Sequence, residues 1–252
     1  MDTIDWTRTK AAVWRARNAH LREIRRLDPI GLDQLLGVER QKSLLCQNTE
    51  RFLAGKPANN ALLWGSRGTG KSSLIKALLN RYHDDGLRMI EVDKDDLVDL
   101  PDIVDDIREL PQYFVIFCDD LSFEEGESSY KPLKSVLEGS LELPPENVLI
   151  YASSNRRHLL PERMQDNDQA RVHNTEIHFG DAIEEKISLS DRFGLWLSFY
   201  PISQPEYLTI VDHYFAAWEG DRKALHAEAI RFAQGRGVRS GRVARQFFNA
   251  RS

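Results

Sequence analysis

Residues 65–73 read GSRGTGKSS, and this stretch decides the fold. It matches the phosphate-binding spacing G-x-x-x-x-G-K-[ST] at Gly65, Gly70, Lys71 and Ser72. Glycines let successive backbone N–H groups turn inward around phosphate oxygens. The lysine of such a loop reaches the β- and γ-phosphates, and the hydroxyl that follows it is a ligand for Mg²⁺. The motif therefore predicts a site for a nucleotide.

The flanking residues supply the context that the motif requires. The apolar run NALLW at 60–64 predicts a strand that ends at the loop. After the loop, apolar residues recur at helical spacing at Leu74, Ile75, Leu78, Leu79 and Tyr82. This order aims the positive end of a helix at the phosphates. We expect the nucleotide to contact Gly65, Arg67, Gly68, Thr69, Gly70, Lys71, Ser72 and Ser73.

Composition limits the class of protein. The 252 residues are 41% hydrophobic and 29% charged, with a net charge of −5, as is typical of a globular protein. The acidic balance argues against nucleic-acid binding by bulk charge, although a local basic face is compatible with it. Cys46 and Cys118 lie far apart in the sequence, and neither a signal peptide nor a membrane span is evident. We expect a soluble, cytoplasmic protein.

The N-terminal residues 1–31 are expected to form a helical arm, rich in arginine at Arg15, Arg17, Arg22, Arg25 and Arg26. Both a solvated helix and a contact surface for an acidic partner fit this pattern. Residues 32–55 predict a second helical stretch before the first strand.

Strands and helices then alternate, which predicts a parallel sheet with helices on both faces. The predicted strands are nearly continuous in apolar residues and cover 60–64, 87–93, 113–118, 147–152 and 195–200. Residues 156–190 are mostly polar and predict a surface loop. After Pro201 three helical faces follow. We therefore divide the chain into an arm at 1–31, an α/β core at 32–202 and a helical unit at 203–252.

Two of the strands end in polar residues. YFVIFCDD ends at Asp119 and Asp120, and NVLIYASSN ends at Asn155. The carboxyl ends of parallel strands form the ligand-binding edge of an open α/β sheet. Beside a phosphate loop, Asp119 is expected to hold Mg²⁺, Asp120 to polarise a water molecule, and Asn155 to orient that water or contact the γ-phosphate.

Together these features resemble an AAA+ ATPase from residue 32 onward. This resemblance implies a five-stranded parallel sheet in the order 5-1-4-3-2, sandwiched by helices, with a C-terminal helical lid. Several segments also resemble a bacterial family of predicted ATP-binding proteins that is classed as a domain of unknown function, among them LLGVERQK, WGSRGTGKSSL, YASSNRRHL and EEKISLSDRFGLWLSFYP.

The resemblance implies further roles. The segment LLGV, with Gly37 and Val38, corresponds to the lining of the adenine pocket. Arg192 stands where an arginine finger acts on a neighbouring subunit, with a structural ion pair as the alternative reading. Arg242, or else Arg239, corresponds to the lid arginine that senses the nucleotide.

One position departs from the superfamily pattern. In the superfamily, a glutamate usually follows the aspartate that corresponds to Asp119. Here that next residue is Asp120, whose side chain is one methylene shorter. The shorter arm displaces the carboxylate from the expected water and predicts slower hydrolysis. Glu124 and Glu125 follow in the next loop and are possible substitutes.

Three functions fit these features. The first is an AAA+ ATPase that assembles through Arg192 and uses Mg-ATP hydrolysis to remodel or load a protein or nucleic-acid client. The second is an ATP-dependent switch or adaptor that hydrolyses slowly or not at all. The third, a P-loop kinase for a small molecule, fits the C-terminal helical unit poorly. ATP is favoured over GTP because the sequence contains no N-K-x-D motif.

Overall fold

The computed structural model describes residues 4–124, 129–139, 143–157, 159 and 189–251. Its centre is one sheet of seven strands in the order β2-β1-β4-β5-β6-β3-β7. Every neighbouring pair is parallel except β1 and β2. The strands are β1 (Ala11–Arg15), β2 (His20–Glu23), β3 (Ala61–Gly65), β4 (Leu87–Glu91), β5 (Tyr113–Cys118), β6 (Val148–Ser154) and β7 (Leu195–Phe199).

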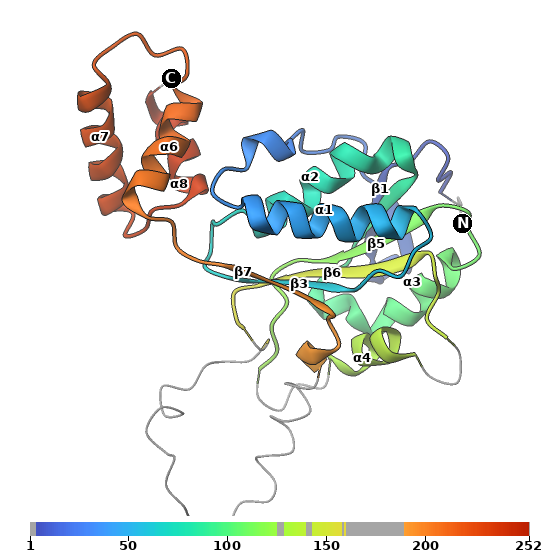
Figure 1. Cartoon of the computed structure of the whole chain (residues 1–252). Helices are drawn as coiled ribbons and strands as arrows, with labels where there is room; N and C mark the ends of the chain where they lie inside the picture. Colours follow the sequence, from blue (N-terminus) through green and yellow to red (C-terminus); the bar gives the residue numbers. More distant parts are fainter. Residues whose placement is uncertain (1–3, 125–128, 140–142, 158, 160–188, 252) are drawn as a thin grey trace, which may run out of the picture.

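Helices cover both faces of the sheet (Figure 1). One face packs on α1 (Glu39–Leu53) and α2 (Lys71–Tyr82), and the other on α3 (Leu100–Ile107) and α4 (Lys131–Glu138). Alternate residues of each central strand enter the two cores, which is why these strands are apolar throughout. Short 3₁₀ segments complete this part of the chain: η1 (Ala16–Asn18), η2 (Leu32–Gln34), η3 (His83–Asp85) and η4 (Lys94–Asp99).

The C-terminal helices form a separate body that projects beyond the end of the sheet (Figure 1). They are α6 (Gln204–Tyr214), α7 (Arg222–Gly235) and α8 (Gly241–Arg251). Their buried residues, such as Tyr207, Leu225 and Phe247, make a third core of their own. Ser203 is the N-cap of α6 and forms a capping box with Glu206. The structure thus has three helices where the sequence predicted a helical unit.

The predicted sheet is correct in its five central strands but wrong in the number of strands. Read from β7 to β4, the central strands follow the predicted order 5-1-4-3-2. Two further strands, β1 and β2, extend the sheet beyond β4.

The predicted N-terminal helical arm is wrong, because residues 11–23 form a β-hairpin. Ala12 and Trp14 pack into the core beside α3, whereas Ala11 enters the core on the opposite face and Val13 is half-buried, so the period is that of a strand. The indole of Trp14 also donates a hydrogen bond of 2.8 Å to Asp99. The arginines obscured this short pattern, and the α/β core begins well before residue 32.

Most of the predicted surface loop at 156–190 lies outside the described residues. Within the described part of the chain, no helix is long and apolar enough to cross a bilayer.

Candidate functional site

The phosphate loop runs from the end of β3 to the start of α2 and is anchored on the edge strand. The backbone N–H of Ser66 donates a hydrogen bond of 3.0 Å to the carbonyl of Phe199 in β7. A side chain at Gly65 would overlap that same carbonyl, so only glycine permits this approach. Gly68 and Gly70 have φ values of +76° and +99°, which L side chains rarely adopt. The glycines of the motif are therefore required by the shape of the loop.

Lys71 lies folded back into the loop that precedes it. Its Nζ donates hydrogen bonds of 2.8 Å to each of the carbonyls of Gly65 and Ser66, and one of 3.1 Å to Oδ1 of Asn155. Burial lowers the pKa of Lys71 to about 8, although Asp120 and Asp119 oppose the shift. The loop thus holds a cation whose charge is sensitive to pH near neutrality.

Asp119 collects the hydroxyl groups at the edge of the sheet. Its Oδ1 accepts hydrogen bonds from Ser72 Oγ at 2.6 Å and from Ser153 Oγ at 2.5 Å. A carboxylate beside a serine hydroxyl provides the oxygen ligands that Mg²⁺ prefers. The pair Ser72 and Asp119 therefore fits a Mg²⁺ ion bound together with a triphosphate.

Asp120 and Asn155 are joined directly. The amide of Asn155 donates a hydrogen bond to the carboxylate of Asp120, while its Oδ1 accepts from Lys71. The backbone of Asp120 has φ of +52°, a left-handed conformation that is uncommon for a residue other than glycine. Its N–H donates to Ser153 Oγ at 3.1 Å, which helps to hold this conformation. Asn155 consequently bridges the loop lysine and the second aspartate.

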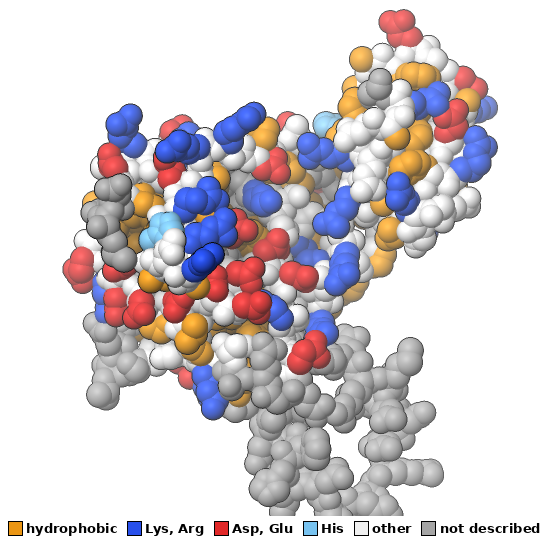
Figure 2. Space-filling model, turned by 180° about the vertical axis from the view of Figure 1, so that it is seen from behind, with side chains coloured by type: hydrophobic (Ala, Val, Ile, Leu, Met, Phe, Trp, Pro, Cys, Tyr) orange, Lys and Arg blue, Asp and Glu red, His pale blue; other side chains and the backbone are white. Residues whose placement is uncertain are grey.

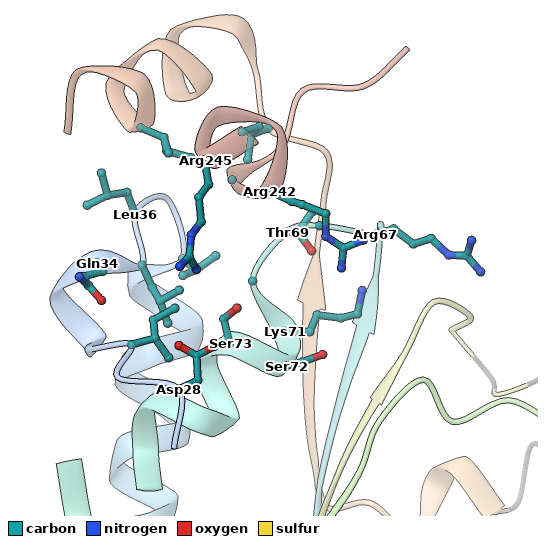
Figure 3. Close-up of a pocket in the computed structure, with 18 of the residues that line it drawn as sticks. Asp28, Gln34, Leu36, Arg67, Thr69, Lys71, Ser72, Ser73, Arg242 and Arg245 are labelled. Atoms are coloured by element: carbon teal, nitrogen blue, oxygen red, sulfur yellow. The ribbon is translucent and has the colours of Figure 1, made fainter. Parts of the chain in front are cut away.

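These groups line one cavity of about 800 Å³. Most of the predicted site residues lie on its wall: Val38, Arg67, Gly68, Thr69, Gly70, Lys71, Ser72, Ser73, Asp119, Asp120, Asn155 and Arg242. Gly37 and Gly65 do not line it. The C-terminal helices close its other side, and Figure 3 shows Arg242 and Arg245 projecting from them toward the phosphate loop.

Arg192 lies away from the cavity. Its guanidinium forms an ion pair with Glu138, the last residue of α4. Its side chain is only 16% exposed. Arg239 is exposed and also does not line the cavity, so of these two arginines only Arg242 lies on the cavity wall.

The first acidic residue of the loop after Asp120 forms an ion pair and does not supply a carboxylate to the cavity. Glu124 pairs with Arg156 at 2.9 Å, and it does not line the cavity. Glu125 lies outside the described residues.

Several cavity residues were not predicted from the sequence. Arg245 lies one turn beyond Arg242 on α8, and the i, i+3 spacing of the two arginines was the available signal. Asp28, Pro29 and Ile30 come from an irregular segment that was assigned to the arm or its end. No local pattern marks such a segment as the wall of a site.

Solved structures share this fold. The Holliday junction branch migration motor RuvB of Thermotoga maritima superposes with a TM-score of 0.56 at 16% identity, over 88% of this chain and 63% of that one. A RuvB mutant of the same organism gives 0.58 at 16% identity, over 88% and 65%. This chain spans less than two thirds of those structures, and at such identity the likeness concerns the fold alone.

No curated protein matches the chain. A family match, in contrast, covers residues 7–252 and thus nearly the whole sequence, hairpin and C-terminal helices included. The chain belongs to the family described as "Protein of unknown function (DUF815)".

Proposed function

We propose that this protein binds Mg-ATP and hydrolyses it as an AAA+ ATPase. One observation carries the proposal: Asn155 joins Lys71 to Asp120 beside the Ser72–Asp119 pair, in a cavity that the C-terminal helices close with Arg242. Cations for phosphate, oxygen ligands for a metal and a carboxylate for water thus meet at one sheet edge.

The chemistry follows from these groups. A bound triphosphate would draw Nζ of Lys71 from the two carbonyls to the phosphate oxygens, and Mg²⁺ held by Ser72 and Asp119 would neutralise their charge. Asp120 would accept a proton from a water molecule that attacks the γ-phosphorus, while the bond between that phosphorus and the ADP oxygen breaks. Arg242 would stabilise the charge that develops in the transition state.

A second candidate is a slow or non-hydrolysing switch. Asp120 is shorter than the usual glutamate, and its carboxylate already accepts a hydrogen bond from Asn155. One oxygen of this carboxylate is therefore already engaged and is less available to a water molecule. In such a protein the C-terminal helices would act as a lid that reports the bound nucleotide to a partner.

The partner surfaces that we propose are the hairpin and the region of Arg192. Arg15, Arg17 and Arg22 are exposed on or beside the hairpin. Figure 2 shows blue side chains gathered on this side of the molecule, next to a band of red ones. An acidic client, whether protein or nucleic acid, fits such a surface. For Arg192 to act on a neighbouring subunit, its ion pair with Glu138 would have to open.

The experiment that tests the function is ATP hydrolysis per protomer, measured over a range of protein concentrations with excess Mg²⁺. Specific activity that rises with concentration, and that Arg192→Ala abolishes, supports a site completed between subunits. A constant rate supports hydrolysis by each monomer and contradicts the role of Arg192. ATP binding without turnover supports the switch, and absence of ATP binding refutes both candidates.

A further inference from the structure

The end of the cavity away from Asp119 and Asp120 is lined mainly by apolar side chains. The core contributes Ile30, Leu35, Leu36 and Val38, and the C-terminal helices contribute Ile210, Tyr214 and Phe248. Figure 3 shows Asp28, Gln34 and Leu36 on one side of the cavity, and Lys71 and Ser72 on the other. A slot walled by aliphatic and aromatic side chains fits a flat nucleobase, whereas the opposite end fits its phosphates.

The core wall of this slot is an irregular segment, residues 28–38, whose only regular part is the short η2. Backbone carbonyls outside helices and sheets need other partners. Nδ2 of Asn80, on α2, donates hydrogen bonds to two of them, of 2.7 Å to Asp28 and 2.8 Å to Ile30. One side chain therefore holds the first part of the segment.

A second side chain holds the remainder from the other helix. Nζ of Lys42, on α1, donates hydrogen bonds of 2.7 Å to the carbonyl of Leu35 and 3.3 Å to that of Leu32. The Lys42 side chain is only 19% exposed. The segment is thus tied to both helices that flank it.

Neither Asn80 nor Lys42 lines the cavity, so each acts through the segment it holds. Asn80 also lies on the helix that begins at Lys71. The same rigid element therefore carries the phosphate-binding lysine at its start and the support of the nucleobase wall near its end.

We propose that Asn80 and Lys42 are positioning residues that fix the nucleobase wall, and that they give the site its preference for a nucleoside triphosphate over bare polyphosphate. The inference rests on the proposed nucleotide binding. Beyond nucleotide binding itself, it assigns recognition of the base to residues other than those that bind phosphate.

The test is calorimetric titration of the full chain with Mg-ATP and, separately, with Mg-tripolyphosphate. In Asn80→Ala the Kd for ATP rises about tenfold, the effect of losing two hydrogen bonds, while the Kd for tripolyphosphate stays within about twofold. Lys42→Met produces the same selective loss and provides a second variant if the first does not fold. Lys76→Ala, an exposed position on α2, leaves both values unchanged.

If either variant weakens ATP and tripolyphosphate equally, or weakens neither, the inference is overturned. Equal affinity of the wild-type protein for the two ligands also overturns it, because the base would then contribute nothing. If the wild-type protein binds neither ligand, the proposed function itself fails.

Discussion

Nucleotide affinity should depend on pH through Lys71. In the unliganded protein burial lowers the pKa of this lysine to about 8. Only the protonated ammonium attracts phosphate, and a triphosphate beside Nζ would keep it protonated in the complex. Affinity is therefore nearly constant below pH 8 and declines above it, because binding must then return a proton to the lysine.

The magnitude follows from the pKa of about 8. The unliganded lysine is about 90% protonated at pH 7 and about 10% protonated at pH 9. The Kd for Mg-ATP should rise about tenfold between these values, and binding should take up about 0.1 proton at pH 7 and about 0.9 at pH 9. Titration calorimetry in buffers of different ionisation enthalpy measures both quantities.

Lys71→Arg provides the control, since a guanidinium stays protonated throughout this range. Its Kd should lack the tenfold rise, whatever its absolute value. A wild-type protein that takes up no proton at pH 9, or a variant with the same pH dependence as the wild type, would refute the reasoning.

Three further predictions concern stability and metal dependence. In denaturant titration, Gly65→Ala should lower the free energy of unfolding by more than about 3 kcal/mol, because the new side chain meets the Phe199 carbonyl. Gly37→Ala should lower it by only about 1 kcal/mol, because Gly37 has a positive φ but lies in open space. Asp119→Asn should make ATP affinity in calorimetry independent of Mg²⁺; a retained Mg²⁺ dependence would place the metal elsewhere. Arg192→Ala should lower the free energy of unfolding by about 1–3 kcal/mol, since it removes the ion-pair partner of Glu138. A decrease below about 0.5 kcal/mol in urea unfolding would contradict a structural role for Arg192.

The parts of the fold that could be predicted are those with a local or strongly periodic cause. The phosphate loop is contiguous, and its glycines, lysine and serine each follow from backbone shape or charge. The central strands are buried on both faces, so their apolar runs are unmistakable. Asp119 and Asn155 could be predicted to lie near each other because parallel strands end at one edge of a sheet, and both residues line the cavity.

The remainder depends on packing that the sequence does not display. The hairpin at residues 11–23 has strands of five and four residues among arginines, too short for a clear period. Arg245 enters the cavity only because α8 docks above the phosphate loop. Asn80 could not be predicted, because its partners are carbonyls of an irregular segment some 50 residues earlier in the chain.

The edge strand β7 has a mechanical consequence. Its last residue, Phe199, accepts the hydrogen bond of Ser66 from the phosphate loop, and only four residues separate it from the start of α6. The connection to the C-terminal helices thus begins directly beside the residue that anchors the loop proposed to bind phosphate. We expect a shift of the phosphate loop to pass through this hydrogen bond to β7 and the connection, and to displace the far ends of α6 and α7 by more than the loop itself moves.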